Sequence, residues 1–377
     1  MGSHTNGVVT NPDRSHDRVL EIPKTMTAVR LNKHGGPEVL SVEQHPVPTP
    51  LANEVLIQVR ASSVTGWDSL YRRGLLTAPP GRASLPMPQQ LGREAAGVIV
   101  SVGDKITHFS PGQRVVVMVS LACGQCAYCR RAEDNQCPHV ALPAHQRFGG
   151  YAEYIVVPEE GLLHAPDNMD FDKLACLLWS YGTAFHMIND KAKVRPGESV
   201  LVSGASGGMG TACLQLVKLA GAHPIIALTG SPAKADMLMS NGADVVLDYR
   251  DADVVKNIRS HTPEGMGVDV VLDNVGGTED MKLVMEATRT GGRLSLVSFL
   301  AGRKIELDLF TLLIRELSLL GNRGSTRRCQ EIVVELAKAG KLDPIVSARF
   351  PLTEIVKATQ MLEDSKHTGK IVVIPGQ

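Results

Sequence analysis

The sequence is poor in aromatic residues and has no excess of either charge. Its 377 residues include 39 Lys and Arg, 39 Asp and Glu, and only 4% aromatic residues. A chain without net charge has no overall field that would attract nucleic acid or an anionic membrane surface. No apolar run approaches the roughly 20 residues that span a bilayer. We therefore expect neither a nucleic-acid partner nor a membrane partner.

The beginning of the chain lacks the apolar segment of a secretory signal. Residues 1–24 are polar and mixed in charge, which predicts a disordered leader. Without an export signal, the seven cysteines are expected to be reduced thiols or metal ligands, and the expected compartment is the cytoplasm. The length suits two domains.

One stretch has the pattern of a dinucleotide-binding unit. Residues 200–202 are a short apolar run typical of a buried parallel strand, and apolar residues recur at helical spacing from 212 to 220. The glycines between them let the backbone approach a pyrophosphate, whose charge the free N–H groups of the helix start bind. A tight strand–helix turn without a ligand is the alternative. The turn residues expected at the cofactor are Ser206, Gly207, Gly208, Met209 and Gly210.

The surrounding sequence separates into two patterns. Further strands are expected at residues 225–228, 268–273 and 293–297, alternating with helical stretches. This alternation predicts a parallel, doubly wound sheet of the Rossmann type. Residues 25–118 instead hold short strands at the spacing of a partly open β-barrel.

Four cysteines are spaced Cys-x2-Cys-x2-Cys-x7-Cys, at Cys123, Cys126, Cys129 and Cys137. Four thiolates on a short loop match tetrahedral Zn²⁺, and four protein ligands leave no open position for chemistry. The ion would stabilise a lobe that has few apolar residues. An iron–sulfur cluster has the same ligand count.

The order of the motifs resembles the medium-chain dehydrogenase/reductase superfamily, which includes zinc alcohol dehydrogenases and quinone and enone reductases. The resemblance covers about residues 25–375. Its motifs are GREAAGVI at 92–99, SVGDKITHFSPGQRV at 101–115, the cysteine cluster, GGYAEYIVVP at 149–158 and SGASGGMG at 203–210.

The resemblance implies an α/β fold with two domains. Residues 25–180 and 325–377 would form a GroES-like, partly open β-barrel catalytic domain, with a zinc lobe near residues 120–140. Residues 181–324 would form the doubly wound Rossmann cofactor domain. The resemblance also implies one structural Zn²⁺ per chain, a small-molecule substrate and a homodimer.

The ligands of that family's catalytic zinc are replaced in this sequence. The three positions are Thr65, three residues before an aspartate, Arg93, in a Gly-Arg-Glu stretch, and Trp179, four residues before Thr183. A hydroxyl, a guanidinium and an indole do not form an open Lewis-acid zinc site.

Without that metal, the expected reaction is hydride delivery from NADPH to an already electrophilic carbon of an enone, a quinone or an iminium. Arg93 would supply fixed positive charge to a developing enolate, or would form a salt bridge with nearby acids. A metal-independent carbonyl reductase or alcohol dehydrogenase is the second hypothesis. A cofactor-binding protein without turnover is the third.

The residues expected around the substrate follow from the same positions. Thr65, Trp67 and Trp179 would line the pocket. Tyr71 and Tyr181 are candidate proton donors, with bulk water as a competitor.

The cofactor is expected to be NADP(H). NAD-specific folds place an acid at the end of the second strand, and here no acid precedes Asp236. In zinc-free relatives Ser, Lys and Tyr hold the 2′-phosphate, and Ser231, Lys234 and Tyr249 stand in those places. A solvated lysine is the alternative for Lys234. The other cofactor candidates are Thr183, Thr229, Asn274, Val275, Ser298, Phe299 and Asn322.

Overall fold

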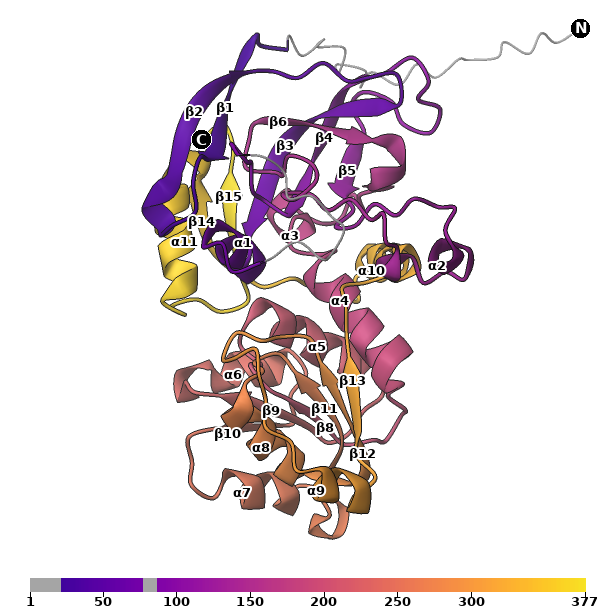
Figure 1. The fold of residues 1–377 in the computed structure, drawn as a ribbon, viewed down its shortest axis with the longest axis vertical. Coiled ribbons are helices and arrows are strands. Elements are labelled where there is room, and N and C mark those ends of the chain that lie inside the picture. Colours follow the sequence, from indigo (N-terminus) through magenta and orange to yellow (C-terminus); the bar gives the residue numbers. More distant parts are fainter. Residues whose placement is uncertain (1–21, 77–86) are drawn as a thin grey trace, which may run out of the picture.

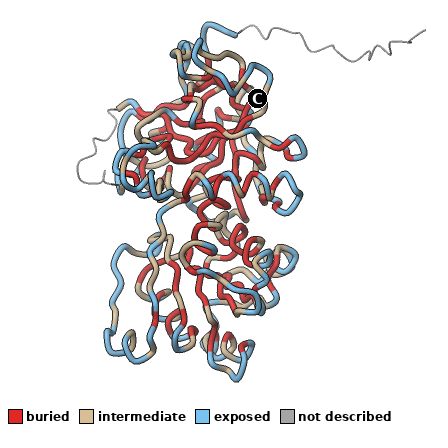
Figure 2. Tube along the Cα trace, turned by 90° about the vertical axis from the view of Figure 1, so that its right-hand side faces the viewer, coloured by how far each residue is buried: buried red, intermediate tan, exposed pale blue. Residues whose placement is uncertain are grey.

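The computed structural model describes residues 22–76 and 87–377, which form an upper and a lower domain along the long axis of the molecule (Figure 1). The leader expected at residues 1–24 lies almost entirely outside the described residues. Buried residues fill the interior of both domains and continue through the waist between them (Figure 2).

The lower domain is built on six parallel strands in the order β10-β9-β8-β11-β12-β13. Counted from β8, this is the doubly wound order 3-2-1-4-5-6, which binds ligands at the carboxyl ends of the strands where the order reverses. The strands are β8 Val200–Val202, β9 Ile225–Thr229, β10 Val245–Asp248, β11 Val268–Asp273, β12 Thr288–Leu296 and β13 Ser318–Gly321.

The helices of this domain lie against the sheet. They are α5 Gly208–Leu219, α6 Ala235–Ser240, α7 Val254–Ser260, α8 Thr278–Ala287 and α9 Leu309–Ile314. Strand β12 begins earlier than residue 293, where the sequence predicted it. Its pairing with β11 passes from Val268–Thr288 directly to Val270–Arg293, so residues 289–292 form an irregularity within the strand.

The upper domain holds a sheet in the order β14-β15-β3-β4-β5-β7, in which β6 also pairs with β3. A separate β1–β2 pair is joined to the rest of the domain by the isolated bridges Ala28–Ala152 and Leu31–Gln89, whose partner residues lie outside the named strands. The strands are β1 Thr25–Leu31, β2 Leu40–Pro46, β3 Glu54–Val64, β4 Glu94–Val102, β5 Arg114–Val117, β6 Tyr154–Pro158, β7 Leu162–His164, β14 Val346–Pro351 and β15 Lys370–Ile374.

The helices of the upper domain and of the waist place the site. Helix α1, Gly66–Arg72, follows β3, and α11, Ile355–Glu363, precedes β15; α3 spans Phe171–Leu174. In the waist, α4 (Ser180–Phe185) continues into a π-helical segment, η4 (His186–Ala192), beside α10 (Arg327–Lys338) and α2 (Ala127–Arg130) of the cysteine lobe (Figure 1). The backbone of Gly369, just before β15, donates to Ser206 O of the glycine turn at 2.8 Å. The chain end thus ties the two domains together.

Candidate functional site

Arg93 stands at the centre of a buried cluster at the start of β4. The residue before it, Gly92, has a φ of +98°, and a Cβ there would lie 2.6 Å from the backbone nitrogen of Tyr151, so only glycine fits this turn. The guanidinium carbon of Arg93 lies 4.5 Å from the ring centre of Trp179 and 5.0 Å from that of Trp67. These are cation–π distances. The turn therefore holds a cation between two indoles.

The charge of Arg93 is retained although the side chain is only 1% exposed. Burial lowers the pKa of Arg93 to about 10, and the charges of Asp68 and Glu94 oppose that shift. The group is therefore protonated at neutral pH. Its Nε and Nη2 atoms are buried without a hydrogen-bond partner among the described residues. An unsatisfied buried donor costs about 1–3 kcal/mol, so an oxygen atom of a ligand would be stabilised here.

Thr65 has a structural role at this position. Its hydroxyl oxygen accepts from Asp68 N at 3.1 Å as the N-cap of α1, and its O–H donates to Asp68 Oδ2 at 2.6 Å. Gly92 N donates to the other carboxylate oxygen at 3.2 Å. Burial raises the pKa of Asp68, against the hydrogen bond from Thr65 and the charge of Arg93. Asp68 thus ties α1 to the turn that carries Arg93.

His145 belongs to the cluster although no sequence motif surrounds it. Trp67 Nε1 donates to its Nε2 at 2.9 Å, and the Tyr71 ring centre lies 4.3 Å from the imidazole centre. Burial, together with the charge of Arg93, lowers the pKa of His145 to about 3. The ring is therefore neutral and fixes the orientation of Trp67. A single histidine in a loop, with no partner at a regular spacing, offers no sequence signal.

Glu94 forms a buried ion pair with Lys370, a second residue that the sequence did not single out. Lys370 Nζ lies 2.6 Å from Glu94 Oε2, and the backbone N–H of Trp179 donates to Glu94 Oε1 at 2.8 Å. The Ser63 hydroxyl also donates to this carboxylate. Glu94 therefore pairs with Lys370 and not with Arg93, and the salt bridge considered for Arg93 does not form with it.

The structure does not bring Tyr181 into the cluster with Tyr71. Tyr181 lies in the core that packs β8 and α5, and its pKa is raised well above its ordinary value, first by burial and then by Cys176 and Asp343. The charges that act on it thus belong to another part of the molecule. Of the two candidate donors, Tyr71 alone lies beside the Arg93 cluster.

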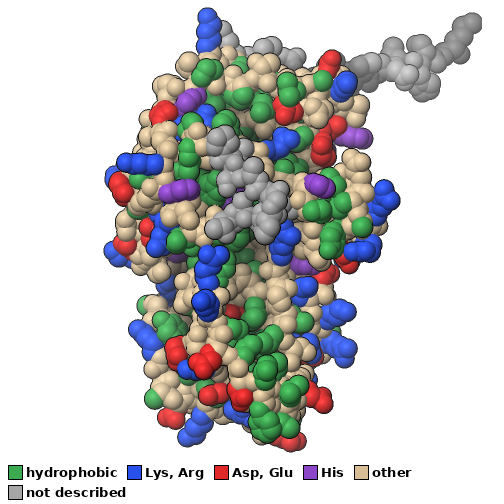
Figure 3. All heavy atoms as spheres, in the orientation of Figure 1, with side chains coloured by type: hydrophobic (Ala, Val, Ile, Leu, Met, Phe, Trp, Pro, Cys, Tyr) green, Lys and Arg blue, Asp and Glu red, His purple; other side chains and the backbone are tan. Residues whose placement is uncertain are grey.

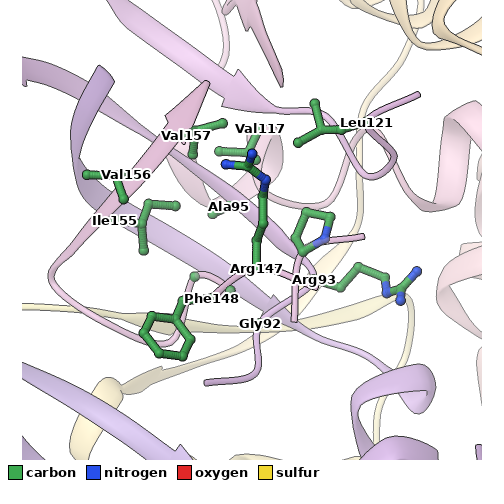
Figure 4. Close-up of a pocket in the computed structure, with 13 residues that line it drawn as sticks. Gly92, Arg93, Ala95, Val117, Leu121, Arg147, Phe148, Ile155, Val156 and Val157 are labelled. Atoms are coloured by element: carbon green, nitrogen blue, oxygen red, sulfur yellow. The ribbon is translucent and has the colours of Figure 1, made fainter. Parts of the chain in front are cut away.

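A small hollow, about 310 Å³ when the adjoining open solvent is counted, borders the backbone of Arg93 just before β4 (Figure 4). Arg147 extends into it among valines of β5 and β6, whereas the Arg93 side chain points away from the other lining residues. This hollow is therefore separate from the place where the Arg93 guanidinium lies.

The glycine turn has the geometry for a dinucleotide. Gly207 is the N-cap of α5 and supplies no side chain to the free N–H groups of the helix. A Cβ on Gly210 would lie 2.3 Å from Gly204 O, so this glycine permits the close packing of helix on strand. The first-turn N–H groups remain for an anion, which fits a cofactor pyrophosphate.

The residues expected near the nicotinamide differ in what they contact. Thr183 Oγ1 and Asn322 Oδ1 are buried without a hydrogen-bond partner among the described residues, which fits a polar ligand. The Asn274 amide instead donates to Ser203 O at 3.0 Å and joins the ends of β8 and β11. The Phe299 ring centre lies 6.4 Å from that of Trp67. Phe299 therefore brings the end of the cofactor domain against the Arg93 cluster.

Ser231, Lys234 and Tyr249 lie in one region, beyond the end of β9. The backbone N–H of Lys234 donates to Ser231 O at 3.0 Å, and a Cβ on Gly230 would lie 2.7 Å from the Tyr249 ring. The Lys234 ammonium donates to His367 O at 2.7 Å, so this lysine is not merely solvated. Burial lowers its pKa.

The four clustered cysteines have the arrangement of a metal centre. Their sulfur atoms all lie within 4.8 Å of one another, and three of the separations are 3.5, 3.5 and 3.9 Å. A tetrahedral zinc with Zn–S bonds of about 2.3 Å requires separations of about 3.8 Å. Hydrogen bonds from the backbone of Gln125 and Cys126 lower the pKa of Cys123 to about 6, whereas burial raises the pKa of Cys129 to about 12 and also that of Cys137, so an ion would have to displace protons from the cluster when it binds. The donor set and its geometry fit Zn²⁺.

A dinucleotide-type domain joined to a GroES-like domain defines a class of two-domain oxidoreductases. Residues 51–167 match the model of the alcohol dehydrogenase GroES-like domain, and residues 208–339 match that of the zinc-binding dehydrogenases. The chain belongs to the medium-chain dehydrogenase/reductase superfamily and is an enzyme of that oxidoreductase family.

Similar proteins cover the chain almost completely. An alcohol dehydrogenase of Schizosaccharomyces pombe is 29% identical over 94% of this chain and 99% of its own length. An acryloyl-coenzyme A reductase of Metallosphaera sedula is 30% identical over 92% of this chain and 99% of its own. The crystal structure of an NAD-dependent alcohol dehydrogenase is 35% identical, with a TM-score of 0.88 over 93% of this chain and 100% of that one.

Within the described residues, no helix has the length and apolar character needed to cross a membrane.

Replacing Cys126 with serine should remove the metal of the cysteine lobe. Loss of a structural metal is among the changes that destabilise a domain by more than about 4 kcal/mol, because the ion supplies folding free energy. We expect the variant to lose the zinc of the four-cysteine cluster by elemental analysis and to unfold at a clearly lower temperature. Cys176→Ser, at a buried cysteine outside the cluster, is the control that should keep its zinc. A zinc-free Cys126→Ser protein with unchanged stability would contradict the structural role.

Proposed function

We propose that the protein is an NADPH-dependent reductase of activated double bonds that works without a catalytic zinc. The observation that carries the proposal is the buried Arg93, whose unpartnered N–H groups lie where Phe299 of the cofactor domain meets Trp67. The positions of the family's catalytic ligands hold a hydroxyl, a guanidinium and an indole. Within the described residues, clusters of metal-ligating side chains occur at two places, and neither is the Arg93 cluster.

The proposed chemistry follows from these groups. NADPH, when bound, supplies a hydride to the β-carbon of an enone or to an equivalent electrophilic carbon. The electron pair of the double bond then moves to the carbonyl oxygen, and Arg93 donates hydrogen bonds to that developing enolate. The Trp67 and Trp179 rings hold the guanidinium and exclude water, which strengthens its interaction with the oxygen. Tyr71 or water returns a proton to the α-carbon. That a relative of similar length is named for acryloyl-coenzyme A, an activated alkene, supports this substrate class.

The preference for NADPH is proposed from the end of β9. The region beyond the end of β9 contains Ser231, Lys234 and Tyr249, and none of these three residues carries a carboxylate. A 2′-phosphate bound there would accept hydrogen bonds from the ammonium and from the two hydroxyls. Because a relative of known structure is named an NAD-dependent alcohol dehydrogenase, the preference for NADPH over NADH has to be measured on this protein.

We also propose a homodimer through β13 and α9. Strand β13 lies at one end of the six-stranded sheet, so one of its edges has no paired strand among the described residues. Next to it in sequence, α9 exposes 66% of Leu309, 70% of Phe310 and 73% of Leu313. Hydrophobic side chains gather on the lower domain in this region (Figure 3). Such a patch marks an interaction site, and a second copy of the same edge strand is the occupant that continues the sheet.

Replacing Arg93 with methionine should lower the turnover of an enone roughly 10–10³-fold, the range for removing one oxyanion donor. NADPH affinity should hardly change, because Arg93 belongs to the substrate side. The measurement is NADPH oxidation with enones, quinones, aldehydes and iminium compounds, together with NADPH binding. Arg147→Met is the matched control and should keep full activity, since Arg147 extends into the separate hollow of Figure 4. An unchanged rate in Arg93→Met would overturn the role, and reduction of aldehydes alone by the unmodified protein would overturn the substrate class.

Replacing Lys234 with alanine should weaken NADPH binding about tenfold to a hundredfold and leave NADH binding nearly unchanged. One charge-assisted contact to phosphate contributes roughly 1.5–3 kcal/mol. Titration of both cofactors by fluorescence or calorimetry provides the measurement, with NADH as the internal control. Equal weakening of both would mean that Lys234 acts through its contact with His367 and not through the phosphate.

Replacing Leu313 with glutamate should dissociate the dimer. A charge placed in the apolar patch must be desolvated on association, which opposes it. Sedimentation velocity should report a dimer for the unmodified protein and a monomer for the variant. Leu51→Glu is the control, because Leu51 is 66% exposed on the other domain, outside the patch. A monomeric unmodified protein would rule out the proposal.

A further inference from the structure

Three side chains of different chemistry meet in the waist, away from both the Arg93 cluster and the four cysteines. His186 is the first residue of the π-helical segment η4, Asp190 lies four residues later, and Cys329 lies in the first turn of α10. His186 and Cys329 are buried, whereas the Asp190 side chain is 30% exposed. π-Helical turns inside helices often occur at functional sites, because they redirect side chains.

The donor atoms of the three residues converge. His186 Nδ1 lies 2.7 Å from Asp190 Oδ2, Cys329 Sγ lies 3.2 Å from the same oxygen, and Cys329 Sγ lies 3.8 Å from His186 Nδ1. A nucleophile–base relay needs its thiol and its carboxylate on opposite nitrogens of the imidazole. Here both face Nδ1, so the arrangement is that of a chelate and not of a relay.

The triangle of donors has nearly the size that a zinc ion requires. Zn–N and Zn–O bonds of about 2.0–2.2 Å and a Zn–S bond of about 2.3 Å give tetrahedral donor separations of about 3.3–3.6 Å. The two separations to sulfur are within a few tenths of an ångström of that range. The third is a hydrogen bond, which would widen when the Nδ1 proton leaves. The exposed side of Asp190 provides a path for the ion and a fourth position for water.

The groups around the triangle fit an ion at its centre. Asn135 Nδ2 lies 3.2 Å from His186 Nε2 and donates to Arg323 O at 2.8 Å, while Asn135 Oδ1 is buried without a partner among the described residues. An ion on Nδ1 would leave the ring proton on Nε2, and rotation of the amide would present Oδ1 to accept it at the expense of the hydrogen bond to Arg323 O. A second partner of this kind orients most metal-binding histidines.

The neighbours of Cys329 Sγ and of the Asp190 carboxylate include groups that would favour and groups that would oppose the binding of a cation. The Thr326 hydroxyl donates to Cys329 Sγ at 3.0 Å, and the sulfur lies at the N-terminal end of a 12-residue helix. Burial, together with Asp190, nevertheless raises the pKa of Cys329 to about 11, so an ion would have to displace the thiol proton when it binds. Arg328 opposes a cation, with its Nη1 3.8 Å from Asp190 Oδ1. Its side chain is 67% exposed and is free to turn toward solvent.

We propose that His186, Asp190 and Cys329 form a second, separate binding site for a zinc-type divalent cation. Cysteine, histidine and carboxylate ligands in a tetrahedral arrangement select zinc, for which cobalt is a spectroscopic substitute. The ion would join α4 and η4 to α10. Through Asn135, which lies in η2 (Asp134–Gln136), it would connect both to the cysteine lobe.

Cobalt titration of protein that holds one zinc per chain, in the four-cysteine cluster, and has been freed of further metal with a mild chelator tests the proposal. The unmodified protein should take up one Co²⁺ per chain, with the intense visible bands of tetrahedral cobalt and a thiolate charge-transfer band, while elemental analysis shows the four-cysteine zinc still in place. Cys329→Ser should lose the charge-transfer band. Cys213→Ser, at another buried thiol, should retain it. Asn135→Ala should weaken cobalt binding about 10–100-fold, as expected for loss of a group that orients a ligand.

Two results would overturn the proposal. One is the absence of cobalt uptake beyond the zinc already present. The other is the same thiolate band in Cys329→Ser as in the unmodified protein, which would mean that cobalt had exchanged into the four-cysteine cluster. Asp190→Asn, which keeps the shape of the side chain and removes its charge, provides the same test if Cys329→Ser does not fold. Its cobalt affinity should fall at least tenfold, and an unchanged affinity would overturn the proposal.

Discussion

The position of the Arg93 cluster depends on the buried ion pair between Glu94 and Lys370. Glu94 is the first residue of β4 and Lys370 the first of β15, and the same carboxylate accepts the backbone N–H of Trp179 ahead of α4. The residue before Lys370, Gly369, donates a backbone hydrogen bond to the glycine turn. One carboxylate therefore aligns a strand of the upper domain, the helix that leads into the cofactor domain and the chain end that contacts the cofactor turn. Removing one partner of such a pair leaves an uncompensated buried charge, which typically costs 3–5 kcal/mol.

This ion pair also explains how a second buried cation is tolerated nearby. Arg93 and Lys370 face Asp68 and Glu94, so the cluster contains two charges of each sign. Burial lowers the pKa of Lys370, but the charge and hydrogen bond of Glu94, together with the charges of Cys176 and Asp68, outweigh burial and leave that pKa above its ordinary value. Because Glu94 is occupied by Lys370 and Asp68 by Thr65 and Gly92, the charge of Arg93 is balanced while part of its hydrogen-bonding capacity remains unused. A cation in this state interacts with a ligand oxygen without first breaking a protein contact.

The parts of the molecule that the sequence predicted are those encoded by local patterns. The glycine turn after Val200–Val202, the alternation of strands and helices, and the cysteine spacing each lie within a few tens of residues, and the fold they predicted is confirmed. The parts that were missed depend on contacts between distant residues. Glu94 and Lys370 are 276 positions apart, Trp67 and His145 are 78, and His186 and Cys329 are 143. Tyr181 illustrates the same limit: it was predicted as a candidate proton donor, but it lies within α4 and is buried in the core that also holds Ala212 and Leu216 of α5. The assignments of individual catalytic and cofactor residues remain predictions.

If Lys234 binds the cofactor as proposed, it connects recognition of the cofactor to the alignment of the domains. Its ammonium donates to the carbonyl of His367, two residues before Gly369, whose N–H is bonded to the glycine turn. An ammonium has three donors, so a 2′-phosphate would share Lys234 with this carbonyl without displacing it. The cofactor would then contact both ends of one short segment, the phosphate through Lys234 and the pyrophosphate at the turn that Gly369 holds. Lys370 follows that segment directly and forms the buried ion pair with Glu94. Because Lys370 directly follows Gly369, a cofactor bound at Lys234 and at the glycine turn would stabilise the same segment that carries the Glu94–Lys370 ion pair beside Arg93.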